Sequence, residues 1–153
     1  MLVGLAVISA LVANYFSPNG IDPLGDKDRS PCRQTAKTFE NVDAREFEIN
    51  SIYRAKELFD SGQTLFVDAR AMEFYTNGHI RGAVSLPLGR FNERFQAFKE
   101  QYPTNISIVT YCYGEGCGDS LQLARFLFEK GYKNVSVMNE GFLRWQAEGY
   151  PVE

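Results

Sequence analysis

The chain has 153 residues, of which 44% are hydrophobic and 23% are charged, and its formal net charge is -3. This length and composition suit one compact α/β domain with an additional tail. The mild, mixed charge argues against a nucleic-acid-binding face, and three cysteines are too few for a disulfide-stabilised scaffold. A single histidine excludes a His-rich metal site.

Residues 1–16 form a hydrophobic segment without a charged side chain. The segment is slightly shorter than the roughly 20 apolar residues of a transmembrane helix, and it lacks the basic start of a cleaved signal peptide. Tyr15 and Phe16 at its end are typical of a membrane interface. We expect a membrane anchor, with the side of the membrane left open. The alternative is a buried or partner-packed helix of a cytoplasmic protein.

Residues 17–38 are rich in Pro, Gly and Asp and show no periodicity, which predicts a linker. Cys32 lies in this linker, and its simplest interpretation is an unpaired thiol. The globular domain is then expected to span residues 39–153.

Short apolar runs alternate with helical patterns throughout the expected domain. Strands are predicted at residues 46–49, 65–67, 83–86, 106–111 and 135–137, and helices at 51–59, 72–75, 90–102, 121–130 and 141–147. Ser51, Asp119 and Ser120 are expected to cap helices, and Phe91, Phe95 and Phe98 have the spacing of a packed helix face. This alternation predicts a parallel sheet with helices on both faces.

The segment from Ile106 to Ser120 carries the strongest chemical signal. A β-branched strand runs into a short loop with two cysteines and three glycines, and a helix follows. Such a loop directs backbone N–H groups toward the helix N-terminus, where a thiolate is stabilised. Cys112, the first residue of the loop, is therefore the candidate nucleophile.

Five motifs occur in a recognisable order along the domain: Asp68-Ala69-Arg70, Gly78 to Ala83 with Leu86-Pro87, Val109 to Cys112, Gly131 to Val135, and Gly141 to Trp145 with Gly149 to Val152. Together they resemble a single-domain rhodanese over most of residues 49–153. The resemblance implies a five-stranded parallel sheet with helices on both faces. It also implies a cysteine, here Cys112, that accepts sulfane sulfur as a persulfide and passes it to a thiophilic acceptor such as cyanide or a thiol.

The loop that would bind the anion departs from the family pattern Cys-x-x-Gly-x-Arg-Ser. It consists of Tyr113, Gly114, Glu115, Gly116, Cys117, Gly118, Asp119 and Ser120. Cys117 stands in place of the arginine, and the loop holds two acids and no base. This composition disfavours the dianion thiosulfate as donor, and it argues against phosphatase or arsenate-reductase activity, which needs the arginine. Arg70 or Arg81 is a candidate for a substitute charge.

Cys117 has two interpretations, a second redox thiol that resolves Cys112 as a disulfide or a small packing residue. A metal site is not expected, because the spacing is unusual and further ligands are missing. His79 is expected to bridge backbone groups in a turn, and Asp68 to hold the loop by hydrogen bonds to backbone N–H groups.

Three functions remain open. The first is a sulfurtransferase or sulfane-sulfur carrier acting through Cys112, the second is a dithiol redox protein using Cys112 and Cys117, and the third is a non-catalytic interaction domain. The expected partners are a small sulfur-containing substrate or a thiol acceptor protein. No cofactor and no nucleic acid are expected, and the oligomeric state stays open.

Overall fold

The computed structural model describes residues 48–49 and 51–153. The expected hydrophobic segment, the linker and Cys32 therefore lie outside the described residues. Within the described part of the chain, no helix has the length and apolar character needed to cross a membrane.

Five parallel strands form one sheet. They are β1 (Glu48–Ile49), β2 (Thr64–Asp68), β3 (Val84–Ser85), β4 (Ser107–Tyr111) and β5 (Val135–Met138), in the spatial order β1-β5-β4-β2-β3. Asp68 pairs in register with Tyr111, and Tyr111 pairs with Met138. These three residues end their strands, so the loops that follow all leave from the same edge of the sheet. Ligands of open parallel sheets bind at this edge.

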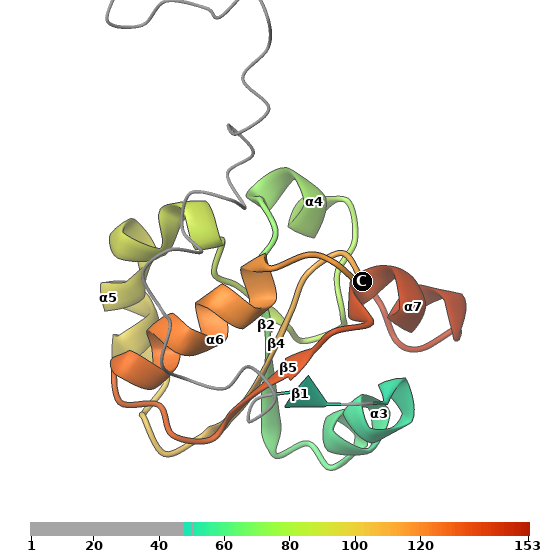
Figure 1. Ribbon diagram of the computed structural model, residues 1–153, viewed down its shortest axis with the longest axis horizontal. Helices are drawn as coiled ribbons and strands as arrows, with labels where there is room; N and C mark the ends of the chain where they lie inside the picture. Colours follow the sequence, from blue (N-terminus) through green and yellow to red (C-terminus); the bar gives the residue numbers. More distant parts are fainter. Residues whose placement is uncertain (1–47, 50) are drawn as a thin grey trace, which may run out of the picture. The chain divides into compact units, whose positions relative to one another are not determined.

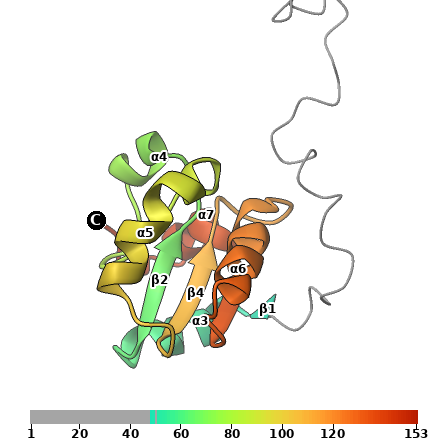
Figure 2. The ribbon, with the colours of Figure 1, turned by 90° about the vertical axis from the view of Figure 1, so that its left-hand side faces the viewer.

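Helices cover both faces of the sheet (Figures 1 and 2). They are α3 (Ile52–Asp60), α4 (Met72–Thr76), the short 3₁₀ helix η2 (Leu88–Arg90), α5 (Phe91–Gln101), α6 (Asp119–Glu129) and α7 (Gly141–Ala147). In Figure 1, α5 and α6 lie on one side of β2 and β4, with α3 and α7 on the other, and Figure 2 shows α7 behind the two strands. The predicted α/β architecture is thereby confirmed.

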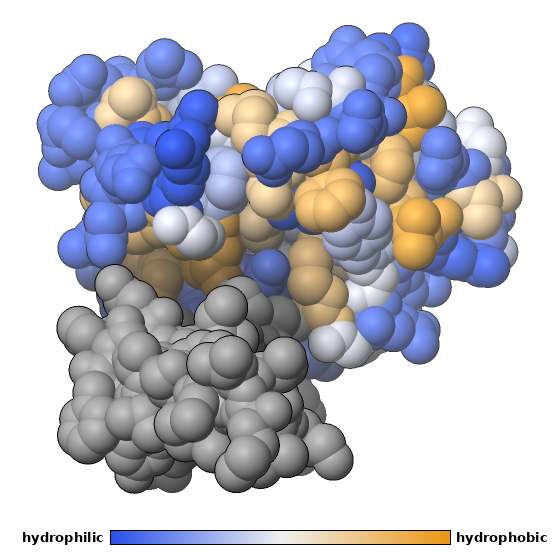
Figure 3. All heavy atoms as spheres, turned by 90° about the horizontal axis from the view of Figure 1, so that it is seen from above, coloured by the Kyte–Doolittle hydropathy of each residue, from blue (hydrophilic) through white to orange (hydrophobic). Residues whose placement is uncertain are grey.

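Each face of the sheet has its own hydrophobic core. Phe91, Phe98 and Leu123 are buried against the face covered by α5 and α6. Phe66 and Trp145 are buried on the face covered by α3 and α7. Among residues 48–49 and 51–153, exposed large apolar side chains are few, and Figure 3 shows one face on which apolar residues lie in small groups among hydrophilic ones.

The capping residue predicted for α3 is confirmed, whereas those predicted for α6 are misplaced. The Ser51 hydroxyl oxygen accepts the backbone N–H of Tyr53 at 3.2 Å and caps α3 as predicted. The prediction that Asp119 and Ser120 cap α6 is wrong, because both lie inside its first turn. Gly118 is the capping residue, and its carbonyl accepts the N–H of Gln122 at 3.0 Å. An acidic Asp119 in the first turn still suits the helix dipole.

Candidate active site

Cys112 follows β4 at the edge of the sheet where the strands end. The residue is only 2% exposed. The carbonyl oxygen of Cys112 accepts the N–H of Phe142 at 2.8 Å, and that of Tyr113 accepts the N–H of Leu143 at 2.9 Å. The first turn of α7 therefore uses two of its otherwise unsatisfied N–H groups to hold the start of the cysteine loop.

Gly141 allows this contact between α7 and the loop. Its φ is +66°, in the left-handed region that favours glycine. A Cβ at this position would lie 2.4 Å from the nitrogen of Gly114 and 2.6 Å from the carbonyl carbon of Tyr113. Both atoms belong to the backbone of the loop and cannot rotate away, so the close approach requires glycine.

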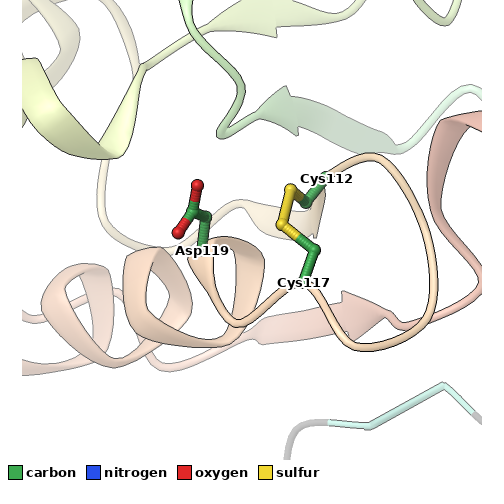
Figure 4. Close-up of side chains that lie close together, drawn as sticks. All are labelled: Cys112, Cys117 and Asp119. Atoms are coloured by element: carbon green, nitrogen blue, oxygen red, sulfur yellow. A yellow bond between two sulfur atoms is a disulfide. The ribbon is translucent and has the colours of Figure 1, made fainter. Parts of the chain in front are cut away.

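The structure joins Cys112 and Cys117 by a disulfide, with their Cα atoms 6.3 Å apart. Figure 4 shows the carboxylate of Asp119 beside the two sulfur atoms. A carboxylate oxygen of Asp119 and both Sγ atoms lie within 4.8 Å of one another. The N–H of Cys117 donates to the carbonyl of Gly114 at 3.2 Å, which tightens the loop. The residues that we selected for redox chemistry are therefore brought together.

Within the described residues, Cys112, Cys117 and Asp119 form the one group of three side chains that could hold a metal ion. The sequence reasoning did not include Asp119 as a third ligand for such a group. While the disulfide is closed, however, neither sulfur is the thiolate that binds a metal. The arrangement found in this structure is therefore suited to redox chemistry at sulfur.

Asp68 and Arg70 form a buried ion pair next to the loop, with Nη2 of Arg70 2.6 Å from Oδ2 of Asp68. Burial lowers the pKa of Arg70, but the hydrogen bonds and charge of Asp68 raise it by more, so the pKa ends above its ordinary value. The guanidinium carbon lies 4.1 Å from the centre of the Phe142 ring and 5.3 Å from that of Tyr113. Arg70 thus supports the loop through a ring contact, and its charge is balanced by Asp68.

Oδ1 of Asp68 also accepts the N–H of Arg70 at 2.9 Å, a backbone bond within the segment that follows β2. The expected bonds from Asp68 to the cysteine loop stay a prediction. Arg81, the other candidate for a substitute charge, is exposed, and its N–H donates to the carbonyl of Pro151. It does not line either of the hollows near the disulfide. A substitute charge from Arg70 or Arg81 therefore stays a prediction.

His79 has the structural role expected for it. Its Nδ1 lies 2.9 Å from the carbonyl oxygen of Tyr75, and its Nε2 lies 3.2 Å from Oε1 of Glu153. The imidazole also stacks on the Tyr75 ring, with centres 3.7 Å apart. The N–H and carbonyl of His79 pair with the backbone of Glu153, which fixes the turn.

Two hollows flank the disulfide region. The first, of about 580 Å³, is lined by Tyr113, Gly114, Glu115, Cys117, Glu140, Leu143, Arg144 and Ala147. The second, of about 430 Å³, is lined by Ala69, Ala71, Met72, Glu73, Pro87, Gly89, Arg90 and Asp119. Cys117 thus borders one hollow and Asp119 borders the other, so both hollows reach residues of the sulfur-containing loop.

Sequence reasoning missed the contribution of α7 to the first hollow. Glu140, Leu143 and Arg144 follow β5, which neighbours β4 in the sheet. The only signal for them in the sequence was their position just after a predicted strand, at the edge where ligands bind. One carboxylate oxygen of Glu140 is buried without a hydrogen-bond partner.

Comparison with known proteins agrees with this architecture. A profile described as "Rhodanese-like domain" matches residues 51–148. The chain belongs to the rhodanese-like domain family.

Two curated relatives contain a similar rhodanese-like region. The chain is 30% identical over 100 residues to thiosulfate sulfurtransferase GlpE of Actinobacillus succinogenes, covering 65% of this chain and 85% of that protein. It is also 30% identical over 94 residues to the HTH-type transcriptional regulator Rv0324 of Mycobacterium tuberculosis. That match covers 61% of this chain and only 39% of the regulator. Relatives of this rhodanese-like domain therefore include both an enzyme and part of a larger regulator.

Solved structures share the fold of this rhodanese-like domain. The BH2092 protein of Bacillus halodurans has a TM-score of 0.62 and 25% identity, covering 71% of this chain and 78% of that one. The human single-domain sulfurtransferase TSTD1 has a TM-score of 0.55 and 20% identity, covering 63% and 93%. At 20% identity, the similarity to TSTD1 is a similarity of fold alone.

Proposed function

We propose that this rhodanese-like domain is a sulfurtransferase that carries sulfane sulfur as a persulfide on Cys112. The observation that supports this most is the position of Cys112, which is buried at the C-terminal end of β4 and held by the first turn of α7. The similarity to thiosulfate sulfurtransferase GlpE supports the same class of reaction. The acceptor in this proposal is a small thiol or a protein thiol.

The loading step requires a thiolate at Cys112. That thiolate attacks the outer sulfur of a donor persulfide, R–S–SH, forms a new S–S bond and expels the thiolate R–S⁻. Glu115 and Asp119 place negative charge in the loop and Arg70 is already paired with Asp68. We therefore propose a persulfide or polysulfide as the donor in preference to the dianion thiosulfate.

The disulfide between Cys112 and Cys117 favours a second, dithiol reaction at the same site. In this reaction the Cys117 thiolate attacks the inner sulfur of the Cys112 persulfide. The Cys112–Cys117 bond forms, the bond to the outer sulfur breaks, and hydrosulfide leaves with the electron pair. The outer sulfur is reduced and the two cysteines are oxidised, so no further oxidant is needed.

Mass spectrometry of the intact protein tests the proposal. The full chain is reduced, freed of reductant and incubated with glutathione persulfide, inorganic polysulfide or thiosulfate. We expect Cys117→Ser to gain the mass of one sulfur from the first two donors, and wild type to release sulfide and form the disulfide. Cys112→Ser is expected to gain nothing at the active site.

Two results would overturn the assignment. Equal sulfur gain by Cys112→Ser and Cys117→Ser would remove Cys112 as the carrier. No sulfur gain by any form, together with failure of wild type to close the disulfide in graded glutathione buffers, would favour the non-catalytic interaction domain.

A further inference from the structure

We infer that Asp119 is the proton-transfer residue for sulfur chemistry at Cys112 and Cys117. The inference rests on the proposed use of these two cysteines, and it assigns a proton-transfer role to a third side chain, in the first turn of α6. Its basis is the placement of one carboxylate oxygen within 4.8 Å of both sulfur atoms, visible beside the disulfide in Figure 4.

The first turn of α6 holds Asp119 in this position. Thr110, a buried residue of β4, donates its hydroxyl hydrogen to the carbonyl of Ser120 at 2.9 Å. The carbonyl of Gly118 accepts the N–H of Gln122 at 3.0 Å. These bonds tie the residues on either side of Asp119 to β4 and to α6, so a rigid element holds the carboxylate near the sulfurs.

Asp119 also lies between the buried sulfur of Cys112 and a hollow at the surface, whereas Cys117 is partly exposed and borders the other hollow itself. Cys112 is 2% exposed, so its thiol has little direct contact with solvent. Asp119 is partly exposed and lines the second hollow, of about 430 Å³, which Glu73 of α4 and Arg90 of η2 also line. A carboxylate in this place can exchange protons with water in the hollow and with a thiol on its other side, directly or through one water molecule.

Asp119 completes the proton balance of the dithiol reaction, in which Cys117 displaces hydrosulfide from the Cys112 persulfide. The carboxylate takes the proton from the Cys117 thiol, and the resulting thiolate attacks the inner sulfur of the Cys112 persulfide. The departing hydrosulfide then takes the proton from the Asp119 carboxylic acid and leaves as H₂S. In the reverse type of step, Asp119 takes the proton from a thiol of an external dithiol as that sulfur attacks the disulfide, and it returns this proton to the departing cysteine sulfur.

The charge of Asp119 provides a way to distinguish a proton-transfer role from a structural one. A negative carboxylate close to two sulfurs opposes thiolate formation, whereas the N-terminus of α6 favours it. Asp119→Asn removes the negative charge and should therefore make the reduced cysteines react faster with iodoacetamide at neutral pH. The same substitution also removes the acid that returns the proton to the departing sulfur, so the sulfur reactions should become slower. A structural contact alone would not produce these two opposite changes.

The experiment compares full-length wild type, Asp119→Asn, Asp119→Glu and Glu93→Gln. Glu93 is the matched control, since it is an exposed acid in the first turn of another helix, α5. Sulfide release after loading with glutathione persulfide is followed by stopped flow, and reduction of the disulfide by dithiothreitol is followed separately across a pH range. Fluorescence of Trp145, which is the only tryptophan and is buried, confirms that each variant is folded.

We expect Asp119→Asn to slow both reactions by about 100-fold, which is typical of losing a positioned proton donor or acceptor. Its rates should rise steadily with pH, Asp119→Glu should recover part of the loss, and Glu93→Gln should match wild type. Folded Asp119→Asn with wild-type rates in both reactions would overturn the inference. If wild type takes up no persulfide sulfur, the proposed function fails, yet the dithiothreitol reaction still decides the role of Asp119.

Discussion

Gly141 provides a direct test of how α7 holds the cysteine loop. In Gly141→Ala the new Cβ would lie 2.4 Å from the nitrogen and 2.6 Å from the Cα of Gly114. The backbone at φ +66° also becomes unfavourable for a residue with a side chain. The left-handed conformation costs about 1 to 2 kcal/mol, and overpacking against fixed backbone costs about 1 to 3 kcal/mol more.

We therefore expect Gly141→Ala to lower the free energy of unfolding by about 2 to 5 kcal/mol. For a domain of this size that corresponds to a fall in melting temperature of roughly 10 °C or more. Urea titration followed by Trp145 fluorescence measures the first quantity, and thermal unfolding measures the second. The displaced loop should also close the Cys112–Cys117 disulfide more slowly than wild type in a glutathione buffer.

Gly149→Ala is the matched control for this experiment. Gly149 has φ +70°, nearly the same as Gly141, but no heavy atom lies within 4 Å of its added Cβ. Gly149→Ala should therefore lower the free energy of unfolding only by the backbone cost of about 1 to 2 kcal/mol. Equal losses in the two variants would refute the reasoning, because the contact of Gly141 with the loop would then contribute nothing measurable.

Other predictions concern groups that hold the domain around the site. Asp68→Ala leaves the Arg70 charge buried and should cost about 3 to 5 kcal/mol in urea unfolding, whereas Asp68→Leu with Arg70→Met should recover most of it; a loss from Asp68→Ala below 1 kcal/mol would contradict this. Trp145→Phe removes the indole N–H that donates to the Pro151 carbonyl at 3.0 Å. It should cost about 1 to 3 kcal/mol by circular dichroism, and unchanged stability would contradict that bond's role. The pKa of Glu153 is lowered because its carboxylate accepts a backbone N–H, so its stabilising effect is full above its ordinary pKa of 4.5 and is lost as pH falls below it. Glu153→Gln should therefore be less stable than wild type at pH 7 and approach it at acidic pH, and a constant difference would refute the linkage.

The secondary structure was largely predictable because its signals are local. Ser51 begins α3 as a capping residue, and Phe91 and Phe98 are buried at the spacing that predicted a packed helix face. The start of α6 was misplaced because Asp119 and Ser120 are good capping residues by type. Gly118, which has no side chain to signal its role, already has helical backbone angles and takes the capping position.

The candidate site was predictable only in part. Cys112 could be selected because a strand, a Gly-rich loop and a helix are consecutive in the sequence. The pairing of Cys112 with Cys117 remained one of two alternatives, because residues five apart in a loop of unknown shape need not meet. The position of Asp119 beside both sulfurs depends on how α6 leaves the loop, which no local pattern specifies.

The sequence by itself determined the family, the alternation of strands and helices, and the cysteine at the end of β4, because periodicity and motif order are properties of the chain alone. The tertiary structure decided what surrounds that cysteine. Parallel pairing of β4 with β5 brings the start of α7 to the loop, where Gly141 permits contact between the two backbones. That packing shapes the loop in which Cys112 and Cys117 meet, with Asp119 beside them, since contacts between distant segments depend on how the sheet is assembled.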